Sequence, residues 1–311
     1  MNASPSVAVI DIGSNSIKIL VAQRTSEGLL TSRFYKTLDA RISAGISKAE
    51  PRLSDEGMTR GLAAIKELLA DAATYTPVKT ILVATSAVRD AANGADFRQR
   101  VLTETRHVVR ILSGDEEANL IGRGLTCDPA LTDQRDFYLF DLGGGSLECL
   151  SFRDRTISQA ISLQLGCVRL TERCVAEPKL AFTAEARLRV RELAREHFVK
   201  SGFSFDLPSH AVTVGTGGTL TTARAILAAR DGKTLETIGS TVTISQLHEL
   251  LDLIGSVDLE TRRRIPGVPA GRADVMPAAL ATFISLAEFG NISVFTNSLY
   301  NLRWGVADEA I

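Results

Sequence analysis

The stretch Asp11-Ile12-Gly13-Ser14-Asn15-Ser16 recurs later in the chain as Asp141-Leu142-Gly143-Gly144-Gly145-Ser146. Each copy follows one apolar run and precedes another, which predicts a strand, an acidic glycine-rich turn and a second strand. The small turn residues leave backbone N–H groups open to phosphate oxygens, and an aspartate at a strand end can hold a cation. Two copies therefore predict two similar halves that both bind a polyanion.

The recurrence, rather than either turn alone, carries this prediction. A single aspartate–glycine turn is common in ordinary hairpins, and either copy alone would be interpreted as one. Two better-known phosphate loops are absent from the sequence, namely GxxxxGK[ST] and GxGxxG after a strand. Their absence argues against a P-loop NTPase and against a dinucleotide-binding fold.

The composition bounds the class of protein and of partner. The chain has 311 residues, of which 45% are hydrophobic and 23% charged, as in soluble globular proteins of about two domains. The formal net charge of −1 offers no overall attraction for nucleic acid or membrane, so we expect neither as a partner. A polyanionic ligand would need a local basic patch. The run Arg262-Arg263-Arg264 is interpreted as a solvated face.

The cysteines and the N-terminus indicate a cytoplasmic protein. None of Cys127, Cys149, Cys167 and Cys174 forms a CxxC pair, so neither a zinc site nor a redox motif is indicated. A reduced compartment fits this cysteine pattern best. Residues 1–5 lack the basic stretch before an apolar one that marks a secretory signal, and no apolar run is long enough to cross a bilayer.

Hydrophobic periodicity predicts alternating strands and helices on both sides of a polar segment near residues 127–136. Ser54 is expected to cap a helix whose apolar stripe recurs at helical spacing. The remaining expected elements are buried strands at 78–84 and 108–112, helices from about 115, at 183–199, from 220, from 245 and at 273–289, and strands at 211–214 and 292–295. This alternation predicts an α/β fold with largely parallel sheets.

The second hairpin has the residues of a metal site. Asp141 and Glu148 stand on its two arms, and the carbonyl of Gly143 lies in the turn between them. Hard oxygen ligands of this kind suit Mg²⁺, which would bridge to phosphate oxygens and offset their charge. In the first hairpin, Lys18 occupies the place of Glu148, so we expect the second half to hold the ion.

Three acids follow the strand at 108–112, where a helix is expected to begin. Asp115 and Glu116 fit the positive end of the helix dipole. Phosphoanhydride hydrolysis needs a carboxylate that orients or deprotonates water, and Glu117 is the candidate. The chemistry alone leaves Glu117 and Glu116 both open.

Two further segments could contact phosphate. Arg89 follows a buried strand, at the end of which ligands of open α/β sheets bind. Its guanidinium could donate two hydrogen bonds to a phosphate, or it could pair with Asp90 or Asp96 on the surface. The loop at residues 215–219 opens a helix, which suits either an anion site or a tight strand-to-helix turn.

Together these motifs resemble the exopolyphosphatase and guanosine pentaphosphate phosphatase (Ppx/GppA) family, from residue 7 to about residue 305. The resemblance is carried by Asp11 to Ser16, Thr85 to Ala91 with Asn93, Ser113 to Ala118, Asp141 to Glu148, Leu165 to Glu172, Gly215 to Thr219, Ile265 to Gly267 and Arg272 to Asp274. It implies an α/β fold of two ribonuclease-H-like domains, the actin/Hsp70/sugar-kinase superfold, around a central cleft. We expect residues 1–127 with 298–311 to form the first domain and residues 128–297 the second.

The resemblance also implies roles for residues. It selects Glu117 as the carboxylate that activates water and gives Arg89 as the motif arginine. The implied phosphate contacts are Ser14, Asn15, Ser16, Gly144, Gly145, Ser146, Gly217 and Arg272. The implied Mg²⁺ site is Asp141, Gly143 and Glu148, with a monovalent cation such as K⁺ as a possible second ion.

The activity implied is hydrolysis of terminal phosphoanhydride bonds of inorganic polyphosphate. The alternatives left open are removal of the 5′-phosphate of guanosine pentaphosphate, an ATP-dependent kinase of the same superfold, and a non-catalytic polyphosphate sensor. Longer family members carry a helical C-terminal region that helps to grip extended polymers and to dimerise. Because this sequence lacks that region, the resemblance does not imply processivity on long chains. It leaves a homodimer open.

Overall fold

The computed structural model describes residues 5–311, and the chain divides into two compact units. Unit 1 comprises Met1–Asp133 with Tyr300–Ile311, and unit 2 comprises Gln134–Leu299. These boundaries lie a few residues beyond the expected ones at 127/128 and 297/298. Residues 1–4, on which the absence of a secretory signal partly rests, lie outside the described residues.

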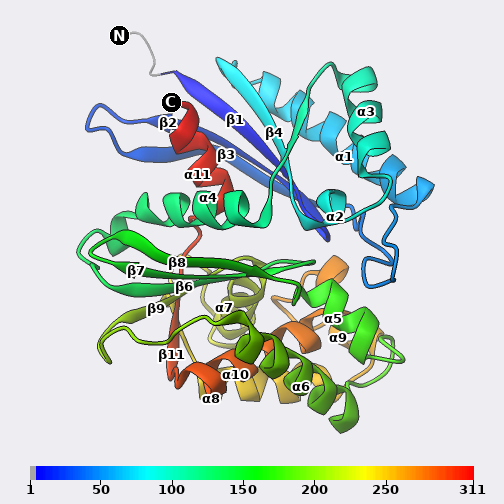
Figure 1. The fold of residues 1–311 in the computed structure, drawn as a ribbon, viewed down its shortest axis with the longest axis vertical. Coiled ribbons are helices and arrows are strands. Elements are labelled where there is room, and N and C mark those ends of the chain that lie inside the picture. Colours follow the sequence, from blue (N-terminus) through cyan, green and yellow to red (C-terminus); the bar gives the residue numbers. More distant parts are fainter. Residues whose placement is uncertain (1–4) are drawn as a thin grey trace. The chain divides into compact units, whose positions relative to one another are not determined.

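Unit 1 is a mixed sheet with helices on both faces. Its strand order is β3-β2-β1-β4-β5, with β1 antiparallel to β2 and parallel to β4. Its elements are β1 (Ser6–Ile12), β2 (Ser16–Arg24), β3 (Leu30–Asp39), α1 (Asp55–Ala73), β4 (Lys79–Ala84), α2 (Ser86–Arg89), α3 (Gly94–Thr105), β5 (Val109–Ile111), α4 (Gly114–Thr126), the short 3₁₀ turn Pro129–Leu131 and α11 (Leu302–Ala310). Helices α4 and α11 cover one face of this sheet and α1 the other (Figure 1).

Unit 2 repeats this plan with an added edge strand. Its strand order is β10-β11-β9-β6-β7-β8, with β6 antiparallel to β7 and parallel to β9. Its elements are β6 (Phe137–Leu142), β7 (Leu147–Arg153), β8 (Thr156–Leu163), α5 (Cys167–Cys174), α6 (Ala184–Ser201), β9 (Val212–Thr216), α7 (Gly218–Arg230), β10 (Thr241–Thr243), α8 (Ile244–Gly255), α9 (Leu259–Arg262), the 3₁₀ turn Ala270–Arg272, α10 (Met276–Gly290) and β11 (Val294–Asn297). The recurrence of the hairpin plan in both units confirms the internal repeat.

The sheets are less parallel than the sequence pattern predicts. The strands β1, β2 and β3, like β6, β7 and β8, run antiparallel as meanders because short turns connect them. The strands β3 and β8 were not predicted, since most of their residues are partly exposed and give no continuous apolar run. By contrast β1 and β6 are buried along their whole length, which makes them the centre of each core.

Helix α10 confirms the predicted long buried helix, with a later start. It begins at Met276 rather than 273, because the preceding 3₁₀ turn ends at Arg272 and Pro277 occupies a first-turn position that suits proline. Its residues from Met276 to Ala287 are all buried, since α5, α6, α7 and α8 surround it. This helix therefore lies at the centre of the helical layer of unit 2.

The run at residues 262–264 is not the solvated face that the sequence suggested. Arg262 is 1% exposed, while the next two arginines are exposed. Its guanidinium donates to the carbonyl oxygens of Ile254, Ala273, Leu180 and Val257 at 2.7–3.3 Å. A buried guanidinium that satisfies several carbonyls ties loops together, so Arg262 is a structural residue.

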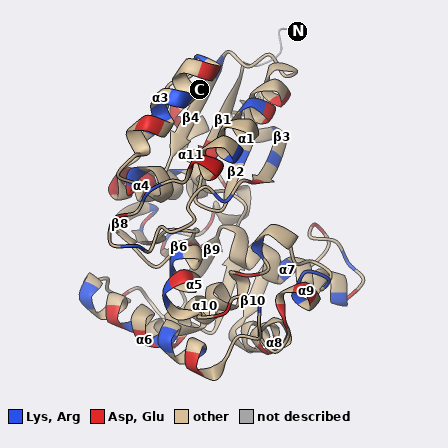
Figure 2. Ribbon diagram, turned by 90° about the vertical axis from the view of Figure 1, so that its right-hand side faces the viewer, with Lys and Arg blue, Asp and Glu red and all other residues tan. Residues whose placement is uncertain are grey.

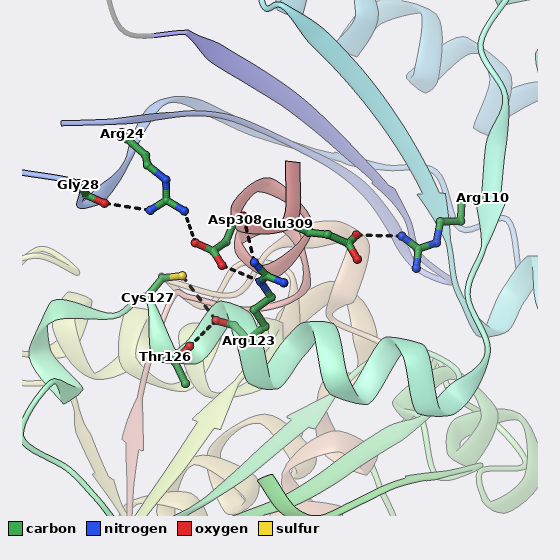
Figure 3. Close-up of polar contacts among 8 residues, drawn as sticks. All are labelled: Arg24, Gly28, Arg110, Arg123, Thr126, Cys127, Asp308 and Glu309. Atoms are coloured by element: carbon green, nitrogen blue, oxygen red, sulfur yellow. Dashed lines mark hydrogen bonds and ion pairs between the residues drawn. The ribbon is translucent and has the colours of Figure 1, made fainter. Parts of the chain in front are cut away.

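Ion pairs fasten the C-terminal helix α11 into unit 1 (Figure 3). Asp308 accepts from Arg24 Nη2 and from Arg123 Nε, both at 2.6 Å. Arg110 pairs with Glu309 at 2.9 Å. The helix that ends the chain therefore bonds to strand β2, to helix α4 and to strand β5.

We expect Asp308→Asn to destabilise unit 1 by about 1–2 kcal/mol, since it weakens hydrogen bonds to two partly exposed arginines. Burial alone would raise the pKa of Asp308, but the bonds from Arg123 and Arg24 outweigh it and the pKa lies below its ordinary value. This contribution is therefore complete above the unfolded pKa of about 3.9 and is lost as the pH falls through the lower folded value. The fluorescence of Trp304, the single tryptophan, reports urea unfolding of this unit.

The matched control is Glu309→Gln on the same helix, whose side chain is exposed and pairs with an exposed arginine. It should change stability by less than about 0.5 kcal/mol. Equal unfolding curves for wild type and Asp308→Asn at neutral pH would contradict the role given to Asp308.

Positive and negative residues are interspersed along α1, α3 and α6 (Figure 2). Across the described residues, no helix combines the length and apolarity needed to cross a membrane. All four cysteines lie within residues 5–311 and none forms a disulfide.

Candidate active site

The first glycine-rich turn lies beside helix α2 in unit 1. Ser14 Oγ is 3.1 Å from Ser86 Oγ, the first residue of α2. The strands β1 and β4 are parallel neighbours, so the turn after β1 and the helix after β4 meet at the same edge of the sheet. The turn residues Asn15 and Ser16 are buried with Ser14.

The same short helix ends at Arg89, which pairs with Glu117. Arg89 Nη1 lies 2.7 Å from Glu117 Oε2 and donates to the carbonyl of Leu112 at 3.1 Å. Arg89 Nε pairs with Asp90 at 3.3 Å. Helix α2 thus connects the predicted phosphate turn, through Ser86, with the predicted arginine and water-activating carboxylate, through Arg89.

The acids at the start of α4 have different surroundings in the structure. Glu116 belongs to a capping box, in which its carboxylate accepts from Ser113 N at 2.8 Å, and it also pairs with Arg110. The backbone bond from Ser113, followed by Arg110, holds the pKa of Glu116 below its ordinary value. The side chain of Glu116 is 46% exposed and that of Glu117 only 8%. Glu116 is therefore occupied as a cap, whereas Glu117 faces inward toward Arg89.

A polar row crosses the sheet of unit 2 beside the second turn. Asp141 is registered with Glu148 on β7 and with Thr216 on β9, and Glu148 is registered with Ser162 on β8. Directly opposed residues of neighbouring strands share a face, so these side chains adjoin. Ser162 Oγ donates to Glu148 Oε1 at 2.8 Å. Both carboxylates are buried, Asp141 near the end of β6 and Glu148 near the start of β7.

The first unit lacks this acidic pair. There Asp11 is registered with Lys18, in the position that Glu148 takes opposite Asp141. Burial raises the pKa of Asp11, while the positive charges of Lys18 and Arg303 act in the opposite direction. The asymmetry read from the sequence is therefore present in the strand register.

The backbone of the second turn is held by helix α5. Cys167 N donates to the carbonyl of Gly143 at 2.9 Å, and Val168 N donates to that of Gly144 at 2.8 Å. A Cβ at Gly166 would come within 2.3 Å of Gly144, so only glycine permits this approach. Because these bonds engage the turn carbonyls, the turn is fixed from the side of α5.

The loop at residues 215–219 brings Gly217 and Gly218 against two charged side chains. A Cβ at Gly217 would lie 2.5 Å from Asp141 Oδ1, and Gly217 has a φ of +84°. A Cβ at Gly218 would lie 2.3 Å from Arg272 Nη1. Within the described chain, the buried atoms Nε and Nη2 of Arg272 have no hydrogen-bond partner. A buried guanidinium with unmet donors suits an anion, since leaving such donors unpaired costs free energy.

We expect Gly217→Ala to lower activity strongly, because the new methyl group displaces the Asp141 carboxylate. Strain at positive φ also costs about 1–3 kcal/mol. The control is Gly232→Ala, which shares a positive φ of +64° but has no atom of the described residues within 4 Å of the added methyl group. Phosphate release normalised to folded protein should fall for Gly217→Ala alone. Equal losses in both variants would mean that strain, and not contact with Asp141, is responsible.

The residues of unit 2 fit a hard divalent cation. Mg²⁺ is commonly bound through one or two carboxylates, with water and substrate phosphates as its other ligands. Asp141 and Glu148 supply such a pair, buried and adjacent in register. One lone pair of the Gly143 carbonyl already accepts from Cys167 N. Residues 5–311 hold no cluster of three or more His, Cys, Asp or Glu able to bind a metal.

The predicted site residues thus form one group in each unit. Unit 1 brings together the first turn, Arg89 and Glu117, and unit 2 brings together the second turn, Asp141, Glu148, Gly217 and Arg272. The sequence named the loop at residues 215–219 but gave no separate role to Thr216, whose buried Oγ1 has no partner among the described residues. Sequence reasoning missed Arg41, which follows the unpredicted strand β3 and bonds to Asn15. Loop packing reveals Arg41, and strand register places Thr216 beside Asp141.

Comparison with known proteins agrees with this arrangement. A model of the Ppx/GppA phosphatase family matches residues 7–311. The chain belongs to the Ppx/GppA phosphatase family. A crystal structure of the Aquifex aeolicus member is 25% identical, with a TM-score of 0.77 over 98% of this chain and 97% of that one. An exopolyphosphatase from Cytophaga hutchinsonii is 23% identical, with a TM-score of 0.86 over 97% and 96% of the two chains.

Membership in the Ppx/GppA family confirms the resemblance inferred from the motifs, and the structural matches confirm the two-domain ribonuclease-H-like α/β fold. A phosphatase of this family acts on a phosphate-containing substrate. The groups gathered in the two units, a carboxylate with an arginine and a carboxylate pair with an arginine, suit that chemistry.

Proposed function

We propose that this Ppx/GppA phosphatase is an exopolyphosphatase that hydrolyses the terminal phosphoanhydride bond of inorganic polyphosphate. The ion pair between Glu117 and Arg89 is the observation that carries the proposal. Hydrolysis needs a carboxylate for water and cationic groups for phosphate, and this pair places one of each 2.7 Å apart.

In this proposal Glu117 accepts a proton from the attacking water as its oxygen bonds to the terminal phosphorus. The bridging P–O bond breaks and the shortened polyphosphate leaves with the bridging oxygen. Arg89 holds Glu117 in place through Nη1 and adds positive charge near the reacting phosphoryl group. The N–H groups of the first turn, which lies in the same unit, would offset the charge of phosphate oxygens.

Unit 2 would hold Mg²⁺ on Asp141 and Glu148. When bound, the ion would offset negative charge on phosphate oxygens. Ser162 keeps Glu148 oriented by donating to Oε1, and Gly217 leaves room for the Asp141 carboxylate. Arg272 and the N–H groups of the second turn would add positive charge toward phosphate oxygens in the same unit.

The second candidate substrate is guanosine pentaphosphate, whose 5′-terminal phosphate would leave by the same water chemistry. The groups described above would contact phosphate rather than a base or a ribose, so they fit either substrate. The two substrates therefore differ in what lies beyond the reacting phosphates.

The test is phosphate release from inorganic polyphosphate and from guanosine pentaphosphate at matched Mg²⁺ concentrations. We expect a higher kcat/KM for polyphosphate, and no release when EDTA removes divalent ions. A much higher value for the nucleotide would reverse the order of the two substrates. ATP-dependent phosphorylation of a sugar or an acid without release from either would indicate a kinase, and tight binding without turnover would indicate a sensor.

A further inference from the structure

The segment that follows β3 holds the first glycine-rich turn. Arg41 N donates to the carbonyl of Asn15 at 2.8 Å, and Arg41 Nε donates to Asn15 Oδ1 at 3.0 Å. Ser43 donates to the carbonyl of Ser14 through N at 3.3 Å and through Oγ at 3.0 Å. Residues 41 and 43 thus fasten both residues at the tip of the turn.

Helix α1 in turn fixes this segment. Arg60 Nε donates to the carbonyl of Ala40 and Arg60 Nη2 to that of Arg41, both at 3.0 Å. Arg41 has a φ of +37°, a left-handed conformation that is unfavourable for a residue with a side chain. Strain of this kind persists where surrounding contacts impose it, and it concentrates at functional sites.

The contact with Arg41 decides which way the Asn15 amide points. Because Arg41 Nε is a donor, it must face the amide oxygen, so Nδ2 faces the opposite side. Nδ2 is buried and, within residues 5–311, has no hydrogen-bond partner. A buried amide donor in a turn of small residues suits a phosphate oxygen.

We propose that Arg41 is a positioning residue, which orients Asn15 so that its Nδ2 donates to a phosphate oxygen of the substrate. This inference rests on the proposed function and assigns Arg41 no direct contact with the reacting atoms. Arg41 would contribute to phosphate binding through the geometry of Asn15 rather than through its own charge.

The second unit has a matching arrangement. Arg169, from the segment after β8, donates through Nε to the carbonyl of Gly145 at 3.0 Å and through N to that of Gly144 at 3.3 Å. Gly145 holds the place in the second turn that Asn15 holds in the first. In each unit, an arginine that follows the third strand therefore donates to the turn. This recurrence supports a role for the contact in holding the conformation of the turn.

A double-mutant cycle tests the inference in the Glu117→Gln chain, in which we expect turnover to be slow. The probe is inorganic tripolyphosphate and the readout is calorimetry. Arg41→Gln and Asn15→Ala should each weaken binding about 10-fold, the scale of one hydrogen bond to a charged group. If Arg41 acts through Asn15, the double variant should bind no more than about 2-fold worse than Asn15→Ala. Additive losses of about 100-fold would overturn the inference.

Further variants separate positioning from charge. Arg41→Lys keeps the charge without the guanidinium Nε–H, so it should bind as weakly as Arg41→Gln, and full binding would overturn the inference. Arg52→Gln, at an exposed arginine shortly after Arg41, should bind normally. Thermal unfolding followed by Trp304 must stay unchanged in each variant, since a loss explained by unfolding of unit 1 would also overturn it.

The outcomes distinguish this inference from the proposed function. Hydrolysis of polyphosphate by the wild-type chain with an additive cycle would reject only the role of Arg41. Binding of tripolyphosphate with a non-additive cycle, but without any phosphate release by the wild type, would reject only the enzymatic function.

Discussion

Glu117→Gln is expected to lower phosphate release at least ~10²-fold, the usual scale for a catalytic acid or base. Glutamine keeps the size of the side chain but cannot take a proton from water. The change also removes the charge that faces Arg89 at 2.7 Å, so the arginine loses this partner and keeps its pair with Asp90. The measurement is kcat on polyphosphate at saturating Mg²⁺, with tripolyphosphate binding measured in parallel.

The neighbouring acid provides the control. Glu116→Gln retains a residue that can complete the capping box and lies on the exposed face of α4, so its turnover should stay within about 2-fold of wild type. Near-normal turnover in Glu117→Gln would reject Glu117 as the base. A large loss in Glu116→Gln with an intact fold would move that role to the capping residue.

Asp141→Asn is expected to lower phosphate release about 10²- to 10³-fold. This is the usual loss when one preorganised group that stabilises charge in the transition state is removed. The amide keeps the shape of the side chain in the buried row but removes half of the carboxylate pair with Glu148. The Mg²⁺ concentration for half-maximal rate should rise. Mn²⁺ binding, followed by its paramagnetic resonance, should weaken in parallel.

Asp154→Asn is the matched control, because Asp154 is an exposed acid in the turn between β7 and β8 of the same sheet. It should leave both the rate and Mn²⁺ binding unchanged. If Asp141→Asn lost activity while Mn²⁺ bound as in wild type, Asp141 would act on the phosphate site by another route and the metal assignment would fail.

The proposed variants test stability and activity at different residues. The Asp308 ion pairs involve no residue of either turn, and their loss should appear in Trp304 unfolding. The Gly217 contact and the Arg41 contact concern side chains that face the proposed ligands. Measurements of unfolding beside each assay therefore tell a weakened unit from a misplaced group.

Local sequence was sufficient for elements with strong local patterns. Ser54 caps α1 by accepting from Gly57 N, as the periodic stripe behind it predicts. The two turns and their flanking strands follow from apolar runs and small residues, which act over a few positions. The strands β3 and β8 lie at or near the sheet edge and are partly exposed, so their residues give no comparable pattern.

The sequence by itself determined the repeat, the kinds of residue in each turn and the place of Lys18 opposite Asp11, because hairpin register follows from turn length. The tertiary structure decided which acid of α4 faces Arg89, that Arg262 is buried, and that Arg41 orients Asn15. These pairs are far apart in sequence, and their distances and burial depend on how strands and loops pack. Short-range sequence patterns do not predict that packing.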